Sequence, residues 1–302
     1  MSSLLGGYAK GGANYNLNEN SNIFANVGRI SRQGTFDAVF PGYANDVNDS
    51  LENEEIASLE LGYGYRSRNL TVNVNVYSTT WGNRFVSNSF DYSLNDSTKI
   101  EDAILQGRGV DVIHSGIELE GRYQATSDLA IRGMLSFGNW RYTSNIDVTV
   151  FDDNQNLIET TTLYTDGAKV GDAAQTTAMI SADYKVAKKT DLDMTFRFVD
   201  GLYADYSLVN SEFLSEDNNG ALKLPSYSLI DLGFTTRFDL FGNAASFRFN
   251  VNNLLDAVYI AESNTNIHAS TDETQNWNGI NTANSVWFGF GRTWNASLRY
   301  NF

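Results

Sequence analysis

The stretch Leu70-Thr71-Val72-Asn73-Val74-Asn75-Val76-Tyr77 alternates strictly between apolar and polar side chains. Successive side chains of a β-strand point to opposite faces, so the leucine and the three valines share one face of a strand. Comparable alternation recurs along the chain over segments of about ten residues, which is longer than the usual strand of a soluble protein. No helical periodicity competes with it, so the pattern predicts an all-β fold.

Together these segments predict eleven strands. They cover residues 7–16, 21–31, 55–65, 69–81, 111–124, 128–142, 173–186, 191–202, 225–238, 244–255 and 285–302. The connections between them alternate strictly between short and long. The short ones lie near residues 17–20, 66–68, 125–127, 187–190 and 240–243, and the long ones near 32–54, 82–110, 143–172, 203–224 and 256–284.

Sorting of loop lengths to opposite ends is typical of a transmembrane barrel, with short periplasmic turns and long extracellular loops. A soluble β-sandwich also alternates, but it has no reason to sort its loops in this way. We therefore expect part of a transmembrane antiparallel up-and-down β-barrel. Within the loop at 143–172, residues 146–151 and 157–163 predict an additional hairpin that projects beyond the membrane.

The composition excludes several other classes of protein. The chain has 302 residues, 36 Asp and Glu against 21 Lys and Arg, a net charge of -15 and no Cys. No run approaches the roughly 18 apolar residues of a membrane helix. The negative charge and the lack of a basic run argue against nucleic acid as a partner. The lack of Cys rules out thiolate metal sites and cysteine nucleophiles. An aromatic content of 13 % argues against disorder.

The C-terminal segment carries a specific signal. Trp294, Leu298, Tyr300 and the terminal Phe302 alternate with polar residues and fall on one face of the expected last strand. A terminal Phe after alternating hydrophobic residues resembles the signal by which outer-membrane barrels are recognised and inserted. The barrel assembly machinery is then an expected partner.

Several short motifs, in their order and spacing, resemble the TonB-dependent outer-membrane receptors. They are Lys10-Gly11-Gly12-Ala13-Asn14-Tyr15, Asn53-Glu54-Glu55 before Leu59-Glu60-Leu61-Gly62-Tyr63, His114-Ser115-Gly116-Ile117-Glu118, Pro225-Ser226-Tyr227-Ser228-Leu229 and Asn252-Asn253-Leu254-Leu255-Asp256 followed by Gly291-Arg292-Thr293-Trp294. The resemblance implies a barrel of about 22 strands around an N-terminal plug. Residues 1–302 would then be the last eleven strands of the barrel domain.

The expected signal peptide, plug, TonB-contacting segment and first barrel half are not found in these residues. Half a barrel would leave two unpaired edges in lipid, where backbone groups cannot bond to water. We therefore expect this chain to be a fragment, a truncated gene product or one piece of a split receptor.

The resemblance implies active uptake of a scarce nutrient across the outer membrane of a Gram-negative bacterium. The nutrient would be a siderophore, vitamin, oligosaccharide or peptide, and TonB would act through the plug. The further expected partners are outer-membrane lipid and the missing barrel half and plug. The alternatives are a porin-like passive or structural barrel built from more than one chain, and a soluble β-sandwich that binds ligands at the cell surface.

Aromatic residues in the long loops are the candidates for substrate contact, because aromatic rings can stack on a ligand. They are Phe36, Phe40, Tyr43, Tyr203 and Tyr206. They could equally pack the loops against one another. Charged residues on the expected lumen face would pair with each other or with the plug. They are Glu60, Glu118, Glu120, Arg122, Arg248 and Arg299.

Catalysis, cofactors and metals find little support in the sequence. His114 and His268 have no recognisable nucleophile motif nearby, so we expect no enzyme and no catalytic residues. Asp152, Asn154 and Asn156 have the opening spacing of a calcium loop, but Leu157 replaces its glycine, so a hairpin turn is expected instead. No cofactor or metal site is predicted.

Overall fold

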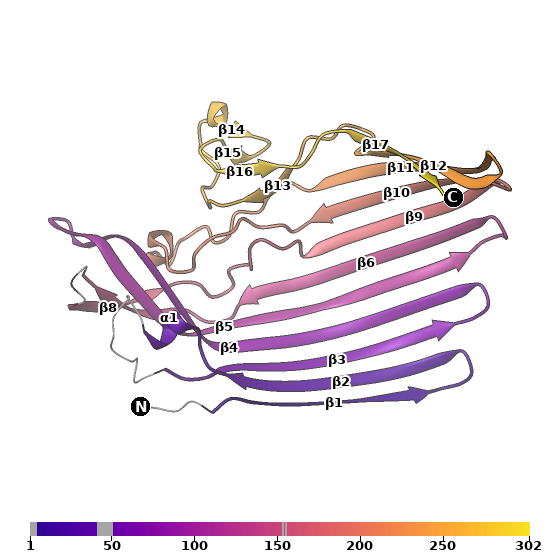
Figure 1. Ribbon diagram of the computed structural model, residues 1–302. Helices are drawn as coiled ribbons and strands as arrows, with labels where there is room; N and C mark the ends of the chain where they lie inside the picture. The colour runs from indigo at the N-terminus through magenta and orange to yellow at the C-terminus, as the bar shows by residue number, and fades with distance from the viewer. Residues whose placement is uncertain (1–4, 41–50, 153, 155) are drawn as a thin grey trace.

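The computed structural model describes residues 5–40, 51–152, 154 and 156–302. One broad, curved antiparallel sheet dominates it (Figure 1). Eleven strands follow one another across this sheet in chain order. They are β1 (Gly7–Asn16), β2 (Ser21–Arg32), β3 (Glu54–Arg66), β4 (Leu70–Asn95), β5 (Thr98–Gln124), β6 (Leu129–Tyr142), β9 (Thr176–Ala187), β10 (Thr190–Asp200), β11 (Tyr227–Leu240), β12 (Asn243–Asn252) and β17 (Thr293–Tyr300).

The expected all-β fold is confirmed, and so is the sorting of the connections. Short turns gather at one end of the sheet, here called the turn end, and long connections gather at the other, the loop end (Figure 1). The predicted hairpin is also present, as β7 (Ile146–Phe151) paired with β8 (Leu157–Leu163). β7 joins the sheet through β5, which brings the sheet to 13 strands.

The sheet is open. β1 and β17 form its two edges and do not pair with each other. All neighbouring strands run antiparallel, and the path between the edges contains eleven strands, so β1 and β17 run in the same direction. The chain is therefore a wall with two free edges.

Two strand predictions were wrong. The segment expected as a long loop at 82–110 continues both neighbouring strands, so that β4 has 26 residues and β5 has 27. The alternation is interrupted there because the register shifts between Trp81 and Arg84 and again before Val86. Asn83 and Gly109 have positive φ angles of 58° and 68° at these bulges. The outer part of the β4–β5 hairpin leaves the sheet obliquely at this point (Figure 1).

The last predicted strand is shorter than expected. β17 covers only Thr293–Tyr300, and residues 286–288 form a separate strand, β16 (Val286–Phe288), which pairs with β13 (Ile260–Ser263) in a small sheet of its own. Gly289 to Arg292 separate the two strands. The remaining short elements lie at the loop end. They are α1 (Phe36–Val39), η2 (Ser211–Leu214), η3 (Glu273–Gln275), β14 (Asn276–Trp277) and β15 (Ile280–Asn281).

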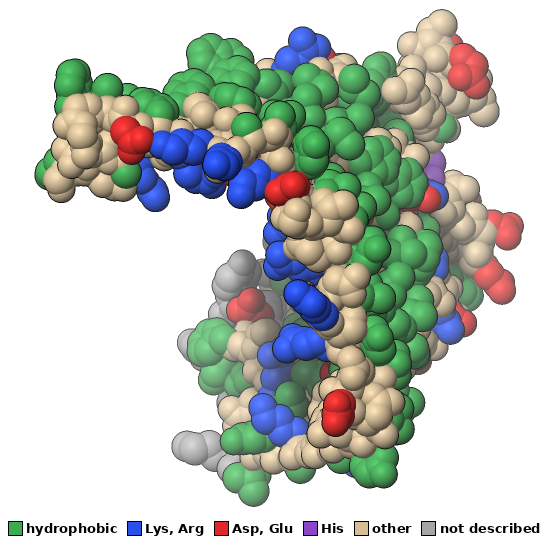
Figure 2. Space-filling view, turned by 90° about the vertical axis from the view of Figure 1, so that its right-hand side faces the viewer, with side chains coloured by type: hydrophobic (Ala, Val, Ile, Leu, Met, Phe, Trp, Pro, Cys, Tyr) green, Lys and Arg blue, Asp and Glu red, His purple; other side chains and the backbone are tan. Residues whose placement is uncertain are grey.

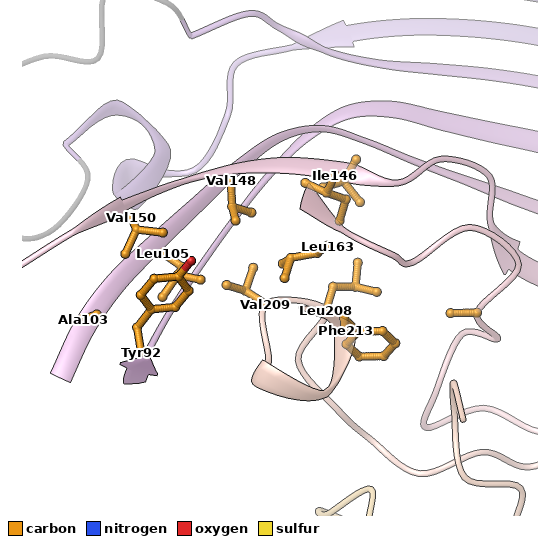
Figure 3. Packing of buried hydrophobic residues seen from close by; sticks show 12 residues of the cluster. Tyr92, Ala103, Leu105, Ile146, Val148, Val150, Leu163, Leu208, Val209 and Phe213 are labelled. Carbon is orange, nitrogen blue, oxygen red and sulfur yellow. The ribbon is translucent and has the colours of Figure 1, made fainter. Parts of the chain in front are cut away.

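A hydrophobic core at the loop end explains why the β4–β5 hairpin extends so far. Figure 3 shows its side chains converging from β4, β5, β7, β8 and the segment that includes η2. Leu105, Val148, Leu163 and Phe213 are completely buried in it. Burial of these side chains stabilises an extension whose sequence, rich in Ser and Asn, otherwise has the composition of a loop. We call this cluster the loop core.

A second, smaller cluster lies beside the last strands. Leu202, Leu224, Ile260 and Ile280 are buried in it. Residues 201–226 contribute to both clusters, since Leu208, Val209 and Phe213 belong to the loop core. The loops are therefore packed structures that are joined to one another. None of the helices in the described ranges is long and apolar enough to cross a membrane.

The two faces of the sheet differ sharply. Viewed from the turn end, its convex side is covered by hydrophobic side chains, and Lys and Arg line the concave side (Figure 2). Leu61 on β3 is 51 % exposed and Ile117 on β5 is 44 % exposed, because no second layer packs on this face in the described structure. A soluble sandwich would bury such residues, so the arrangement argues for a lipid-covered surface.

Candidate functional site

The concave face of β6 to β12 carries a network of ion pairs. Each pair joins side chains from different strands or from the adjoining turn. The pairs are Arg132–Asp183, Arg197–Asp231, Arg237–Asp191, Arg248–Asp193 and Lys189–Asp239. The alternation of each strand places these charges on the side opposite the apolar residues. This part of the wall is thus largely neutralised by its own side chains.

The most specific of these pairs spans three strands. Arg248 on β12 donates from Nη1 and Nη2 to the two carboxylate oxygens of Asp193 on β10, at 2.8 and 3.0 Å. Nη1 also donates to Oγ1 of Thr235, at 2.9 Å. Gly233 on the intervening strand makes room for this contact, because a Cβ there would lie 2.3 Å from Asp193 Oδ1. The expectation that lumen-face charges pair with each other is confirmed for Arg248.

The concave face of β2 to β5 is different. Glu60 accepts a hydrogen bond from Asn26 Nδ2 at 2.9 Å. In the described part of the chain, neither Glu118 nor Glu120 has a basic group within salt-bridge distance. Arg122 likewise has no acidic group within salt-bridge distance among these residues. This side of the wall retains charges that its own strands do not neutralise.

A cluster of aromatic and charged side chains lies where the concave face meets the loop end. Arg32 Nε donates to Oε2 of Glu54 at 2.7 Å, and Trp81 Nε1 donates to the same oxygen at 3.2 Å. The guanidinium carbons of Arg32 and Arg84 lie 4.9 and 4.6 Å, respectively, from the ring centroid of Trp81. Glu54 is only 5 % exposed. We call these four residues the rim cluster.

Two aromatic rings extend this surface along the concave face. Trp140 Nε1 on β6 donates to the Tyr77 hydroxyl on β4 at 3.0 Å. His114 on β5 packs edge-on against Trp140, with 5.6 Å between ring centres. Nε2 of His114 is buried and has no hydrogen-bond partner among the described residues.

The predicted substrate-contact residues that the structure describes do not form one site. Phe36 and Phe40 lie together on and beside α1, with ring centres 4.9 Å apart, and Phe36 is largely exposed. Tyr206 packs against Phe213 in the loop core and donates its hydroxyl to the Lys169 carbonyl, and burial raises the pKa of its hydroxyl. Their roles in substrate binding stay predictions.

Tyr203 lies in another part of the loop end. Tyr203 forms an isolated bridge with Lys223, near the second hydrophobic cluster. Tyr43 lies outside the described residues. Contact between substrate and either residue stays a prediction.

The turn between β7 and β8 is closed by its own side chain. Asp152 Oδ1 accepts hydrogen bonds from the backbone N–H groups of Asn154 and Asn156, at 3.0 and 2.7 Å. The side-chain amide of Asn156 also donates to Oδ2 of Asp152, at 2.8 Å, and this bond, together with the backbone bonds, lowers the pKa of the Asp152 carboxyl. The geometry is that of a hairpin turn, as expected, and the described residues contain no cluster of three or more metal-binding side chains.

The two histidines are far from any catalytic arrangement in the described structure. His268 contacts the Gly220 carbonyl through Nε2, at 3.1 Å, and His114 contacts Trp140. Neither ring is hydrogen-bonded to a serine hydroxyl in the described ranges.

The C-terminal strand places part of the predicted insertion signal on the convex face. Trp294 and Leu298 on β17 are 70 % and 62 % exposed. Tyr300 ends the strand, and Phe302 lies two residues beyond it, fully exposed. Recognition of these residues by an assembly machinery stays a prediction.

A wide antiparallel sheet with an apolar convex face, a charged concave face and sorted connections is the wall of a transmembrane β-barrel. The chain belongs to the TonB-dependent receptor-like β-barrel family, whose family model matches residues 8–254. The resemblance drawn from the motifs is thereby confirmed. Proteins of this family are outer-membrane receptors rather than enzymes.

Solved receptors have the same fold. The ferric yersiniabactin uptake receptor FyuA from Yersinia pestis superposes with a TM-score of 0.64 at 15 % identity, over 97 % of this chain and 37 % of its own. The copper transporter OprC gives 0.61 at 15 %, over 95 % and 38 %. BauA, the ferric preacinetobactin receptor from Acinetobacter baumannii, gives 0.61 at 17 %, over 96 % and 36 %. The chain thus spans well under half of each structure.

No curated protein matches this chain in sequence. At such low identity the superpositions show a common fold, and they assign no ligand. Sequence reasoning did not single out Trp81 and Arg84 of the rim cluster. It placed Arg32 and Glu54 at the two ends of a predicted loop, whereas the structure pairs them on β2 and β3.

Proposed function

We propose that this protein acts in TonB-dependent active uptake of a scarce nutrient across the outer membrane of a Gram-negative bacterium. This chain supplies barrel wall and extracellular loops. The observation that carries the proposal is the sheet itself: a lipid-type convex face backed by a concave face of charged and amide side chains, in a chain that belongs to the receptor family. A polar concave face is suited to hold a plug and to let a polar solute pass.

The free edges support a partner that completes the barrel. Both edge strands run in the same direction, so pairing β17 with β1 would create a parallel seam. The same would follow if β17 paired with β1 of a second copy that is rotated about the barrel axis. Antiparallel closure requires an odd number of further strands. We propose that the rest of the receptor barrel provides them and encloses a plug through which TonB acts.

We propose two further roles for residues of this chain. The face of β17 that bears Trp294 and Leu298, together with Tyr300 and Phe302, serves as the insertion signal for the barrel assembly machinery. The loop aromatics Phe36, Phe40, Tyr43, Tyr203 and Tyr206 contribute to substrate capture or to the packing of the loops that capture it. Substrate classes carried by such receptors include siderophores, vitamins, oligosaccharides and peptides.

Uptake in the presence and absence of TonB tests this function. Cells with and without the receptor would be given labelled ferric siderophores, cobalamin, oligosaccharides and peptides, with TonB intact or inactivated. We expect at least one compound to accumulate only when both the receptor and TonB are present. Accumulation that requires the receptor but not TonB would instead support a porin-like passive barrel.

A further inference from the structure

The rim cluster contains an arginine whose hydrogen-bond donors have no partner among the described residues. Arg32 is neutralised by Glu54, which also accepts the indole N–H of Trp81. Arg84 stacks on the same indole at 4.6 Å, and among the described residues it has no carboxylate within salt-bridge distance and makes no side-chain hydrogen bond. The cluster therefore carries one unneutralised positive charge at the rim of the concave face.

A guanidinium stacked on an aromatic ring is well placed to bind an anion. The ring supports the guanidinium without using its N–H donors, and these donors match the two oxygens of a carboxylate. The backbone also positions Arg84, because it lies between two register shifts of the β4–β5 pair and is opposite the buried Val110. Little side-chain entropy is then lost when a ligand binds.

The surroundings select against a ligand with many negative charges. The described parts of five loop-end segments (33–40 with 51–55, 82–111, 143–175 apart from 153 and 155, 201–226 and 253–292) contain 22 acidic residues and 6 basic ones. Such a surface repels polyanions and attracts cations. A cationic donor group within an acidic rim is complementary to a molecule that carries both signs of charge.

We propose that Arg84, stacked on Trp81, binds the carboxylate of a zwitterionic ligand of the short-peptide class, whose positively charged part faces the acidic loops. His114 lies on the same concave face, and its Nε2 is buried without a hydrogen-bond partner among the described residues. This inference rests on the proposed uptake function and specifies its substrate class.

Binding of simple peptides to the intact receptor in detergent tests the proposal. Trialanine and trilysine, each with a free C-terminus or a C-terminal amide, would be titrated by equilibrium dialysis, with citrate as a polyanionic comparison. We expect at least one free peptide to bind saturably and its amide to bind roughly tenfold more weakly or worse, since a charge-assisted hydrogen-bond pair is lost. Citrate should bind more weakly than that peptide.

Variants assign the effect to Arg84. Arg84→Gln should weaken binding of the free peptide about as much as amidation does, and Arg84→Lys should retain part of it because the charge remains. Arg108→Gln is the matched control, because Arg108 is an exposed arginine on the same hairpin, and it should change nothing. Equal binding of free and amidated peptide, no saturable binding of either peptide, or unchanged binding by Arg84→Gln would overturn the proposal.

These outcomes are separable from failure of the uptake function. Binding in detergent requires no TonB. TonB-dependent uptake of some other nutrient, together with no peptide binding, would remove the substrate class and leave the function standing. Peptide binding without any TonB-dependent uptake would do the reverse.

Discussion

Arg248 reaches over Gly233 to hold both carboxylate oxygens of Asp193, so that one ion pair ties together three consecutive strands of the wall. The contact depends on the absence of a side chain on the strand between them. Because the pair is only partly exposed on the concave face, it fixes the relative positions of β10, β11 and β12 close to the free edge at β17.

Gly233→Ala should destabilise this part of the wall. The added Cβ would lie within 2.6 Å of atoms of both Asp193 and Arg248, so the pair must shift. We expect a loss of about 1–3 kcal/mol in the free energy of unfolding, as for other overpacked sites. Gly133→Ala is the control, since its nearest contact would be at 3.8 Å. Urea unfolding of the assembled receptor measures both, and equal effects of the two changes would refute the role assigned to Gly233.

The two faces of the sheet should respond differently to a new charge. Leu61→Arg or Val74→Arg places a guanidinium on the convex face and should cost about 2–4 kcal/mol near the middle of the membrane. Asn73→Arg places the same group on the concave face, so it should cost much less. Folding equilibria in lipid vesicles give these differences. Similar costs on both faces would contradict the assignment of the convex face to lipid.

A cavity in the loop core should destabilise the loops without destabilising the wall. Leu163→Ala removes a completely buried side chain and should cost the loop core about 2–5 kcal/mol. Leu157→Ala on the same strand is the control, because Leu157 is 64 % exposed. Protease added to intact cells should cleave the first variant faster in the loops, while the amount of receptor in the membrane stays unchanged. Equal cleavage of both variants would mean that the core does not hold these loops together.

The loop core should also weaken at high pH. Burial, with the neighbouring Glu159 carboxylate, raises the pKa of Tyr92 to about 12. The ordinary tyrosine pKa is about 10, so the stability that neutral Tyr92 contributes is complete below that pH and is lost as the pH rises toward 12. Tyr92→Phe cannot ionise, so its loops should lose less stability over this interval. Protease resistance of the loops at pH 9 to 12, compared between the two proteins, measures the difference; parallel curves would contradict it.

The sequence predicted most of the wall because each strand has one face in contact with lipid. Alternation is then a direct consequence of the environment, as in residues 70–77, and the observed β1 coincides with the predicted segment. The hairpin beyond Trp81 was missed because the bulge at Asn83 breaks the period. Its strands are stabilised by contacts with β7, β8 and η2, which are distant in the sequence.

The candidate site was less predictable. Alternation predicts that Arg248 lies on the lumen face. Its partner Asp193 lies two strands away, so that pairing depends on the register of three strands. The rim cluster likewise combines residues from β2, β3 and β4. Aromatic content alone gave no means of separating Tyr206, which packs in the loop core, from Phe36, which is exposed.

The orientation of the wall in the outer membrane is the central claim, and the absence of Cys allows a direct test. Ser97→Cys places a single thiol at the tip of the β4–β5 hairpin, and Ser127→Cys places one in the turn between β5 and β6. Both serines are exposed, so the chemical change is matched. A membrane-impermeant maleimide added to intact cells should label the Ser97→Cys protein and should label the Ser127→Cys protein only after the outer membrane is permeabilised. Equal labelling of both in intact cells, or labelling of the Ser127→Cys protein alone, would contradict a barrel wall with its loops outside the cell.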